Sequence, residues 1–494
     1  MKKFVKFGVV FGVLLLMLIG GVSLTACAGK VDEKRNHYTL NVVYDEVNMT
    51  LLGEERVIYV NTSENAFDKL YFHLYPNAFR EGAKASVVSG SKKDEAYYNG
   101  LSYGCIEIRA VSIEGYDVCY EIEGEDKNIL AITLQEALYP DEFITINISF
   151  SAEMPQIHHR FGVGENTINV GNFYPIACVY EDGVGFSKDL YHANGDPFYS
   201  ECADYIVTID CSDAFQVAST GMVKGSHIKN GRLITTVFAE NVRDFCFVLS
   251  EKFEVATQTF EGVAVNYYGY KGDKDIEKNL QVAIKALKTF NQLFGVYPYT
   301  TLSVVKANFI HGGMEYPNIV LISDKVSEQD FEYVIVHEIA HQWWYGVVGN
   351  NQYIHAWMDE GLAEYSALLF YKINTEYGED FDKMIDSARK SYRLYVKVFT
   401  KVNGGADGVM DKPICEYATE PEYVECTYTK GVLLMDAIKN SIGEKNFLKA
   451  LKLYYNQFKF KLAAPEDFIA SFIKVSSGDM EGFINSWLYD KVVV

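Results

Sequence analysis

The sequence predicts a multidomain protein in which an N-terminal antiparallel β domain, of the saddle or sandwich type, precedes a C-terminal α+β domain. Residues 37–255 repeatedly alternate apolar and polar side chains, which is the period of a half-buried strand. In residues 256–494, long stretches instead place apolar side chains three and four positions apart, the period of a helix. Hydrophobic residues make up 49% of the chain and charged residues 22%, so each domain can bury a core.

The first 36 residues predict export and a lipid anchor. Lysines at the start of the chain precede an apolar run from Phe7 to Val22, and Leu24-Thr25-Ala26-Cys27 resembles a lipobox, the processing signal of bacterial lipoproteins. We therefore expect a signal peptide over residues 1–26, lipidation of Cys27 and a linker over residues 27–36. The alternative is an uncleaved signal anchor, since the run is nearly long enough to span a bilayer. Both place the remaining chain outside the cytoplasmic membrane.

Individual elements follow from the same periods. Tyr38–Val42 and Ile144–Ile148 alternate and predict strands of the β domain, with Gly, Asn and Asp turns between such runs. The α+β domain opens with strands expected at Thr301–Ala307 and Asn318–Ile322. Helices are expected at Phe331–Trp344, which follows a capping box at Ser327 and Asp330, at Gly431–Ile442 and at Lys445–Phe458.

The first of these helices contains His337-Glu338-Ile339-Ala340-His341, an HEXXH pattern that combines a metal site with a general base. Residues four apart lie on one helix face, so His337 and His341 can bind one metal ion with Glu338 beside it. A catalytic zinc takes three protein ligands and keeps one position open for water. The third ligand must therefore come from elsewhere in the chain, and Glu360, nineteen positions after His341, is well placed to supply it.

The spacing also distinguishes between classes of zinc peptidase. The long metzincin pattern needs Gly and His where Trp344 and Val347 stand. A carboxylate from a second helix that begins near Asp359 fits two histidines and one glutamate instead. The pattern is that of a gluzincin metalloprotease holding one Zn²⁺.

Two further segments flank this site in sequence, Gly312-Gly313-Met314-Glu315-Tyr316-Pro317 before it and Tyr428-Thr429-Lys430-Gly431 after it. Together with the pentad and Glu360, in this order and at these separations, they resemble peptidase family M1, the aminopeptidase N-like zinc metallopeptidases. The chain departs from that family's motifs at Asp359 and Tyr316, where the family has Asn. The resemblance implies a thermolysin-like fold for the α+β domain, and more weakly it makes residues 195–207 similar to the family's substrate-capping β-saddle.

The resemblance also implies roles for these residues. Gly312, Gly313, Met314 and Glu315 form the exopeptidase motif, in which the Glu315 carboxylate holds the substrate α-amine by an ion pair. Tyr428 is the implied donor to the oxyanion that develops during hydrolysis, and Tyr423 is the alternative. Glu338 then takes the proton of the attacking water and passes it to the leaving amine. Asp359 and Glu364 are possible outer partners of the zinc-binding histidines, which the sequence leaves unassigned.

Composition restricts the partners and the redox chemistry. The formal net charge of −21 argues against nucleic acid and against a broad anionic lipid surface as partners. Nine cysteines include no C-x-x-C pair, so neither a redox motif nor a cysteine zinc site is indicated. If Cys27 is lipidated, the other eight form disulfides or remain free thiols; Cys415 and Cys426 are close in sequence, but their pairing does not follow from it.

We expect from these observations a lipid-anchored, extracytoplasmic zinc aminopeptidase, a hydrolase that releases N-terminal residues from peptides. A gluzincin endopeptidase with the same zinc chemistry and a surface-binding lipoprotein with a catalytically weak fold are the alternatives. The chain ends soon after Trp487-Leu488-Tyr489, so we expect no additional C-terminal helical domain of the kind common in the family, and a more open cleft. No obligate protein partner is expected.

Overall fold

The computed structural model describes residues 35–489. The predicted signal peptide, the lipobox with Cys27 and most of the linker lie outside the described residues. Lys34–Val494 form one compact unit, and both hydrophobic cores lie between Tyr38 and Leu488. In the described part of the chain, neither core uses a residue before Tyr38. Within residues 35–489, no helix has the length and apolar character needed to cross a membrane.

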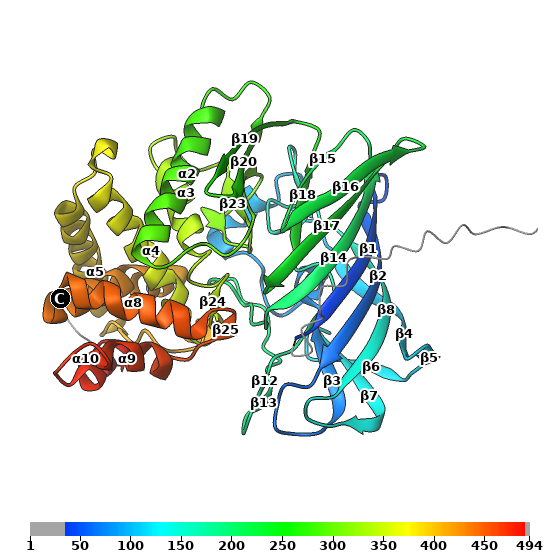
Figure 1. Cartoon of the computed structure of the whole chain (residues 1–494), viewed down its shortest axis with the longest axis horizontal. Helices are drawn as coiled ribbons and strands as arrows, with labels where there is room; N and C mark the ends of the chain where they lie inside the picture. Colours follow the sequence, from blue (N-terminus) through cyan, green and yellow to red (C-terminus); the bar gives the residue numbers. More distant parts are fainter. Residues whose placement is uncertain (1–34, 490–494) are drawn as a thin grey trace, which may run out of the picture. The chain divides into compact units, whose positions relative to one another are not determined.

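The N-terminal domain is built around an eight-stranded sheet (Figure 1). Buried and more exposed side chains alternate along its central strands, so one face packs on the domain core. Neighbouring strands are antiparallel, except that β1 (His37–Asp45) and β14 (Ala203–Ser212) run parallel. In spatial order the strands are β16 (Met222–Lys229), β17 (Arg232–Val242), β14 (Ala203–Ser212), β1 (His37–Asp45), β2 (Thr50–Val60), β8 (Phe143–Glu153), β4 (Cys105–Ile113) and β5 (Tyr116–Asp117).

Two four-stranded sheets and a small hairpin complete this domain. The first sheet contains β15 (Gln216–Ser219), β18 (Cys246–Ser250), β10 (Ile168–Gly171) and β9 (Phe161–Val163). The second contains β11 (Ile176–Ala177), β3 (Phe67–His73), β7 (Ile129–Leu138) and β6 (Tyr120–Glu123), and the hairpin pairs β12 (Tyr180–Glu181) with β13 (Gly185–Phe186). The segment between β3 and β4 carries the short turns η1 (Tyr75–Phe79), η2 (Gly90–Lys92) and α1 (Lys93–Ala96).

A five-stranded mixed sheet opens the C-terminal domain and separates the two cores. Its strands, in spatial order, are β19 (Phe253–Phe260), β20 (Val263–Tyr270), β21 (Thr301–Ala307), β23 (Ile319–Ser323) and β22 (Gly313–Met314). Adjacent residues of a strand face opposite sides: Val304 belongs to the core under the helices and Val305 to the core of the β domain. The short edge strand β22 pairs antiparallel with β23.

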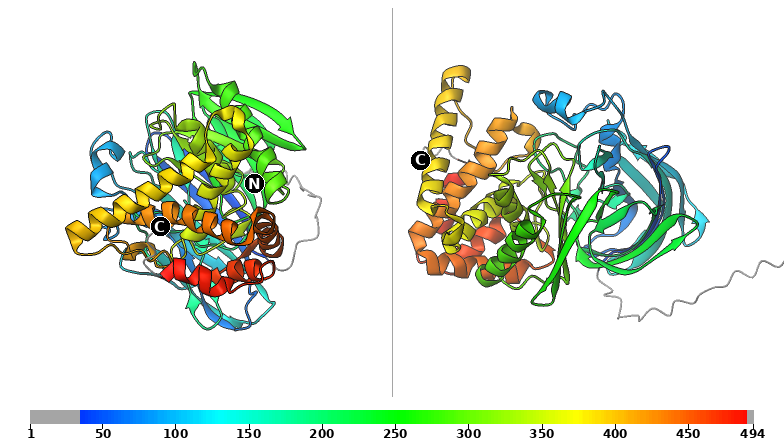
Figure 2. Two further views of the ribbon diagram at one scale, coloured as in Figure 1. Left: turned by 90° about the vertical axis from the view of Figure 1, so that its left-hand side faces the viewer. Right: turned by 90° about the horizontal axis from the view of Figure 1, so that it is seen from above.

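Helices cover the other side of this sheet (Figures 1 and 2). They are α2 (Ile276–Leu293), α3 (Phe331–Ala340), α4 (Trp357–Ile373), α5 (Phe381–Asn403), α6 (Glu420–Val424), α7 (Lys430–Ile442), α8 (Glu444–Phe458), α9 (Pro465–Ile473) and α10 (Met480–Tyr489). Short turns lie at η3 (Thr375–Tyr377), η4 (Ile414–Glu416) and η5 (Glu425–Thr429), and β24 (Val348–Gly349) pairs with β25 (Lys461–Leu462). The predicted fold class, a β domain followed by an α+β domain, is confirmed.

The zinc-motif helix is shorter than the sequence predicts. We expected it to reach Trp344, but α3 ends at Ala340 with His341 as its C-cap. Beyond this point the backbone tightens, because Gln342 N–H bonds the Ile339 carbonyl and Trp343 N–H bonds the Ala340 carbonyl, each three residues back. The tryptophans at 343 and 344 keep the sequence apolar but pack in the core from a turn rather than from a helix.

The structure also shows the positions of two other features discussed from the sequence, residues 195–207 and the cysteines. Of residues 195–207, which resemble the β-saddle in sequence, residues 195–202 contain no strand and residues 203–207 lie in β14 of the large sheet. All eight cysteines in the described part of the chain are free thiols, including Cys415 and Cys426.

Candidate metal and peptide site

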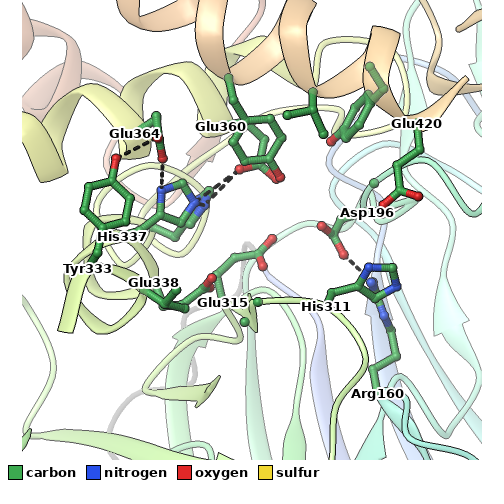
Figure 3. A pocket seen from close by; sticks show the side chains of 18 of the residues that line it. Arg160, Asp196, His311, Glu315, Tyr333, His337, Glu338, Glu360, Glu364 and Glu420 are labelled. Carbon is green, nitrogen blue, oxygen red and sulfur yellow. Dashed lines mark hydrogen bonds and ion pairs between the residues drawn. The ribbon is translucent and has the colours of Figure 1, made fainter. Parts of the chain in front are cut away.

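Two histidines and one glutamate converge at the junction of α3 and α4 (Figure 3). Nε2 of His337 lies 3.1 Å from Nε2 of His341. Glu360 Oε2 lies 3.4 Å from the first of these nitrogens and 3.3 Å from the second. Zinc–ligand bonds of about 2.0–2.1 Å at tetrahedral angles separate two ligand atoms by about 3.3 Å. The three atoms are therefore spaced as ligands of one zinc ion.

The chemistry of the surrounding atoms also fits a zinc ion. Glu360 Oε2 is buried and has no hydrogen-bond partner, so a cation would satisfy a charge that is costly to bury. Each ring presents Nε2 to the site because its other nitrogen is engaged elsewhere. His337 Nδ1 lies 2.8 Å from Glu364 Oε2, and His341 Nδ1 lies 3.0 Å from the Trp344 carbonyl. Glu364 is thus one of the outer partners that the sequence left unassigned.

Asp359 has a different position. Its carboxylate accepts hydrogen bonds from Asn350 Nδ2 at 3.1 Å and from Gln352 Nε2 at 2.6 Å. Glu315 and Asp359 also bring oxygens within 4.8 Å of a His341 nitrogen, which makes a second metal-like cluster. Because the amides already engage both Asp359 oxygens, this cluster is a less suitable metal site than the first.

Glu338 faces the pocket from the helix turn that carries both histidines. Its carboxylate lies against Gly313, where a side-chain carbon would come within 2.3 Å of Glu338 Oε1. The second glycine of the Gly-Gly-Met-Glu segment therefore leaves room for the base. Burial raises the pKa of the Glu338 carboxyl to about 7, and the neighbouring histidines oppose that rise.

Glu315 is buried in the same pocket and is held by Gln352, whose Nε2 donates to Glu315 Oε1 at 2.8 Å. Burial, and then the nearby Asp196 carboxylate, raise the pKa of Glu315 well above its usual range. Tyr316, which stands where the related motif has Asn, points away into the β domain and donates to Asn172 Oδ1 at 2.6 Å. The exchange at position 316 therefore adds no side chain to the pocket wall.

Asp196 is the acidic residue that the sequence analysis missed. It reaches the pocket from the segment before β14 and forms an ion pair with the buried Arg160 (Figure 3). Asp196 lies in the stretch that resembles the β-saddle, but an acid between Gly195 and Pro197 is also common in surface turns, so it was not singled out. Asp196 and Glu315 are two carboxylates facing one space beside the zinc-ligand triad.

Tyr428 lies on η5, a π-helical turn that joins α6 to α7. Such turns are frequent at functional sites, because the inserted residue breaks the regular helix ladder. The Tyr428 ring stacks on His337 with a centroid distance of 5.9 Å. Burial raises its pKa well above the ordinary value and the Glu360 charge adds to this, so the phenol keeps its proton at neutral pH. Tyr423 also lines the pocket, with its hydroxyl against Gly195.

The pocket that contains these groups has a volume of about 270 Å³. At its rim, Lys92 of η2 in the N-terminal domain forms an ion pair of 2.7 Å with Glu420 of α6 in the C-terminal domain. Figure 3 places Glu420, His311 and Arg160 on the far side of Asp196 from His337. The pocket is therefore bounded by the zinc ligands at one end and by a charged pair that joins the two domains at the other.

Comparisons with known proteins agree with this geometry. Residues 278–487 match the model of the peptidase family M1 domain. Aminopeptidase 2, mitochondrial, of Saccharomyces cerevisiae is 26% identical over 317 residues, which cover 58% of this chain and 31% of the yeast protein. Endoplasmic reticulum aminopeptidase 2 of Homo sapiens is 27% identical over 245 residues, 46% of this chain and 24% of that protein. The matched regions thus span about a third of these relatives or less.

The whole fold also resembles a solved structure. A crystal structure of an M1 zinc metallopeptidase from Deinococcus radiodurans superposes with a TM-score of 0.65 and 16% sequence identity, and the match covers 93% of this chain and 94% of that one. Both domains described above therefore have counterparts in a single solved chain. The ligand triad in this chain is accordingly a site for one Zn²⁺.

Proposed function

We propose that this chain, whose residues 278–487 match the model of the peptidase family M1 domain, is a zinc-dependent aminopeptidase that removes N-terminal residues from peptides. The observation that carries the proposal is the position of Glu315 relative to the zinc ligands. One of its carboxylate oxygens lies within 4.8 Å of a His341 ring nitrogen. The α-amine and the carbonyl carbon of one residue are two bonds, or about 2.5 Å, apart, so an α-amine held at Glu315 brings the first carbonyl of the peptide next to the zinc ligands.

The charge of the pocket supports a cationic substrate group. Asp196, Glu315, Glu338 and Glu360 are gathered in one buried space, and only Asp196 has a full ion pair to an arginine. Buried carboxylates need compensating positive charge. The metal supplies part of it, and a protonated α-amine supplies a further charge next to Glu315 and Asp196.

Each residue then has a defined task. When bound, zinc supplies a Lewis acid that polarises the scissile carbonyl and lowers the pKa of a water molecule. Glu338 accepts a proton from the attacking water and delivers it to the nitrogen of the leaving peptide. Tyr428 donates its phenol hydrogen to the oxyanion, which it can do because its proton is retained at neutral pH. His337, His341 and Glu360 hold the metal.

The far end of the pocket favours an exopeptidase over an endopeptidase. A substrate with residues before the cleaved bond would have to extend past Asp196 toward the Lys92–Glu420 ion pair, which lines this side of the pocket. A substrate that ends at its α-amine meets two carboxylates there and needs no further space. We also propose, from the lipobox alone, that Cys27 anchors the enzyme at the outer face of the cytoplasmic membrane.

The test uses purified protein, fluorogenic aminoacyl substrates with free amines, and the same substrates with acetylated amines. The free-amine substrates should be cleaved, a chelator should stop the reaction and added zinc should restore it. Glu338→Gln should retain zinc by elemental analysis and lose about 10²- to 10⁴-fold in rate. The matched control is Glu328→Gln, an exposed glutamate just before α3. Equal cleavage of acetylated substrates, or substantial turnover by Glu338→Gln, would refute the assignment.

A further inference from the structure

The outer face of α5 carries an apolar stripe with no protein partner in the described chain. Leu394, Val398 and Val402 are 60%, 44% and 74% exposed, and their spacing of four residues puts them in one line along the helix. The helix packs through Tyr392 and Tyr395, which are buried beside the stripe, so the exposed stripe is not its packing surface. Figure 2 shows one end of α5 projecting clear of the neighbouring helices.

Lysines flank this stripe. Lys390, Lys397 and Lys401 lie on the same exposed side of the helix, and none of the three forms an ion pair with the described residues of the chain. From residue 390 to residue 403 the sequence has no acidic residue, although the whole chain has a formal charge of −21. Glu425 of η5 accepts a hydrogen bond from Ser391, and within α5 Asp386 pairs with Arg389, so these two carboxylates meet other positions than the three lysines.

This combination restricts the partner. A second copy of the same face would bring lysines against lysines, which disfavours a symmetric dimer. A soluble polyanion would satisfy the lysines but leave the apolar stripe in water. An anionic lipid surface satisfies both, because lysine side chains reach headgroup phosphates while an apolar stripe enters the boundary of the acyl chains.

We propose that the face of α5 formed by Lys390, Leu394, Lys397, Val398, Lys401 and Val402, named here the α5 face, binds the surface of an anionic phospholipid bilayer. The helix lies in the plane of that surface. The site is separate from the peptidase pocket, and the proposal depends on neither the zinc site nor the anchor at Cys27.

The experiment uses residues 34–494, which contain both cores and lack the N-terminal apolar run. Cosedimentation is measured with vesicles of phosphatidylcholine alone and of phosphatidylcholine with about 30% phosphatidylglycerol, in low salt of about 0.05 M, where charge interactions reach further. Binding to the anionic vesicles should be at least about tenfold tighter and should weaken when salt is raised to about 0.5 M. Failure to bind anionic vesicles in low salt would overturn the proposal.

Three variants separate the parts of the α5 face. The charge variant K390E/K397E/K401E and the apolar variant L394S/V398S/V402S should each weaken binding about tenfold or more. The control K224E/K229E/K274E changes the net charge equally at exposed lysines away from α5 and should bind as the unchanged protein does. If the control loses as much as the charge variant, net charge alone explains binding and the proposal is wrong.

A competition arm tests the other class of partner. Soluble polyphosphate should displace the protein from vesicles only weakly. Two results together would show that the α5 face recognises a polyanion rather than a bilayer. Polyphosphate would bind the apolar variant as tightly as the unchanged protein, and it would prevent vesicle binding when its total phosphate charge equals that of the vesicles. All variants should retain peptidase activity and an unchanged circular dichroism spectrum, which distinguishes loss of the surface from loss of the fold.

Discussion

Gly431→Ala should separate α4, which carries the zinc ligand Glu360, from α7, which directly follows the turn that carries Tyr428, the proposed oxyanion donor. Gly431 of α7 and Gly361 of α4 are in backbone contact, and a side-chain carbon on Gly431 would lie 2.6 Å from the Gly361 Cα. Ordinary carbon contacts begin near 3.5 Å, so α4 and α7 must part by about 1 Å. Glu360 directly precedes Gly361, and Tyr428 lies three residues before Gly431. The distance between these two side chains should therefore increase directly.

The magnitudes follow from this geometry. Overpacking of a core contact costs about 1–3 kcal/mol, which lowers the melting temperature by several degrees at about 2–4 °C per kcal/mol. A misplacement of about 1 Å costs on the order of 10²-fold in rate. The assay compares kcat, zinc content and thermal melting of Gly431→Ala with those of Gly478→Ala, whose added carbon would meet open space. If Gly431→Ala keeps the activity and stability of the control, the helix contact does not set the geometry of the site.

Four further predictions concern single residues. Glu364→Ala should weaken zinc binding about 10- to 100-fold in competition with a chelator, because His337 Nδ1 loses its carboxylate; unchanged affinity would remove that role. Tyr428→Phe should retain zinc and lose about 10²- to 10³-fold in kcat, while a larger loss in Tyr423→Phe would transfer the donor role to Tyr423. Burial raises the pKa of Asp244 to about 6, so the folded chain holds this proton more tightly than the unfolded chain and loses stability as the pH rises from about 4 to about 6. Asp244→Asn, which still accepts from Tyr345, should abolish this loss and gain about 2–3 kcal/mol at neutral pH in denaturant unfolding; equal pH profiles would contradict the argument. Cys27→Ser should block processing or release the protein from membranes at about 0.5 M salt, where binding by the α5 face is weak, and unchanged acylated membrane association would exclude the lipobox.

Local periodicity predicted much of the fold because it records burial directly. The strand expected at Thr301–Ala307 is β21, and the helix expected at Lys445–Phe458 is α8 with one residue added at its start. The end of α3 was not predictable in this way. The same apolar residues that continue the helical pattern to Trp344 pack equally well from a tight turn, so the pattern could not distinguish the two.

The sequence predicted those site residues whose type and short spacing along the chain are characteristic of a zinc site. His337 and His341 are brought together by one helix turn, and Glu360 follows within the same pair of helices. Asp196 was missed because its position depends on the contact between two domains, and nothing in Gly195-Asp196-Pro197 indicates which pocket it enters. Gln352 was missed for a similar reason: an amide that holds Glu315 and Asp359 has no sequence signature.

The arrangement of charge explains why the proposed exopeptidase specificity and the metal site belong together. Glu315 is buried, and among the described residues its hydrogen-bond donor is the neutral amide of Gln352, so no positive charge compensates its carboxylate and its pKa is raised. A blocked substrate would fill the pocket without supplying a cation and would leave that carboxylate desolvated beside Asp196, which adds a penalty to the loss of an ion pair. A free amine removes this penalty at the same time as it aligns the carbonyl. Blocked peptides are therefore disfavoured twice, by the lost ion pair to Glu315 and by the desolvation of its carboxylate. The neutral Glu315→Gln variant should still position the substrate carbonyl in part, but it should lose most of the preference for free-amine over blocked peptides.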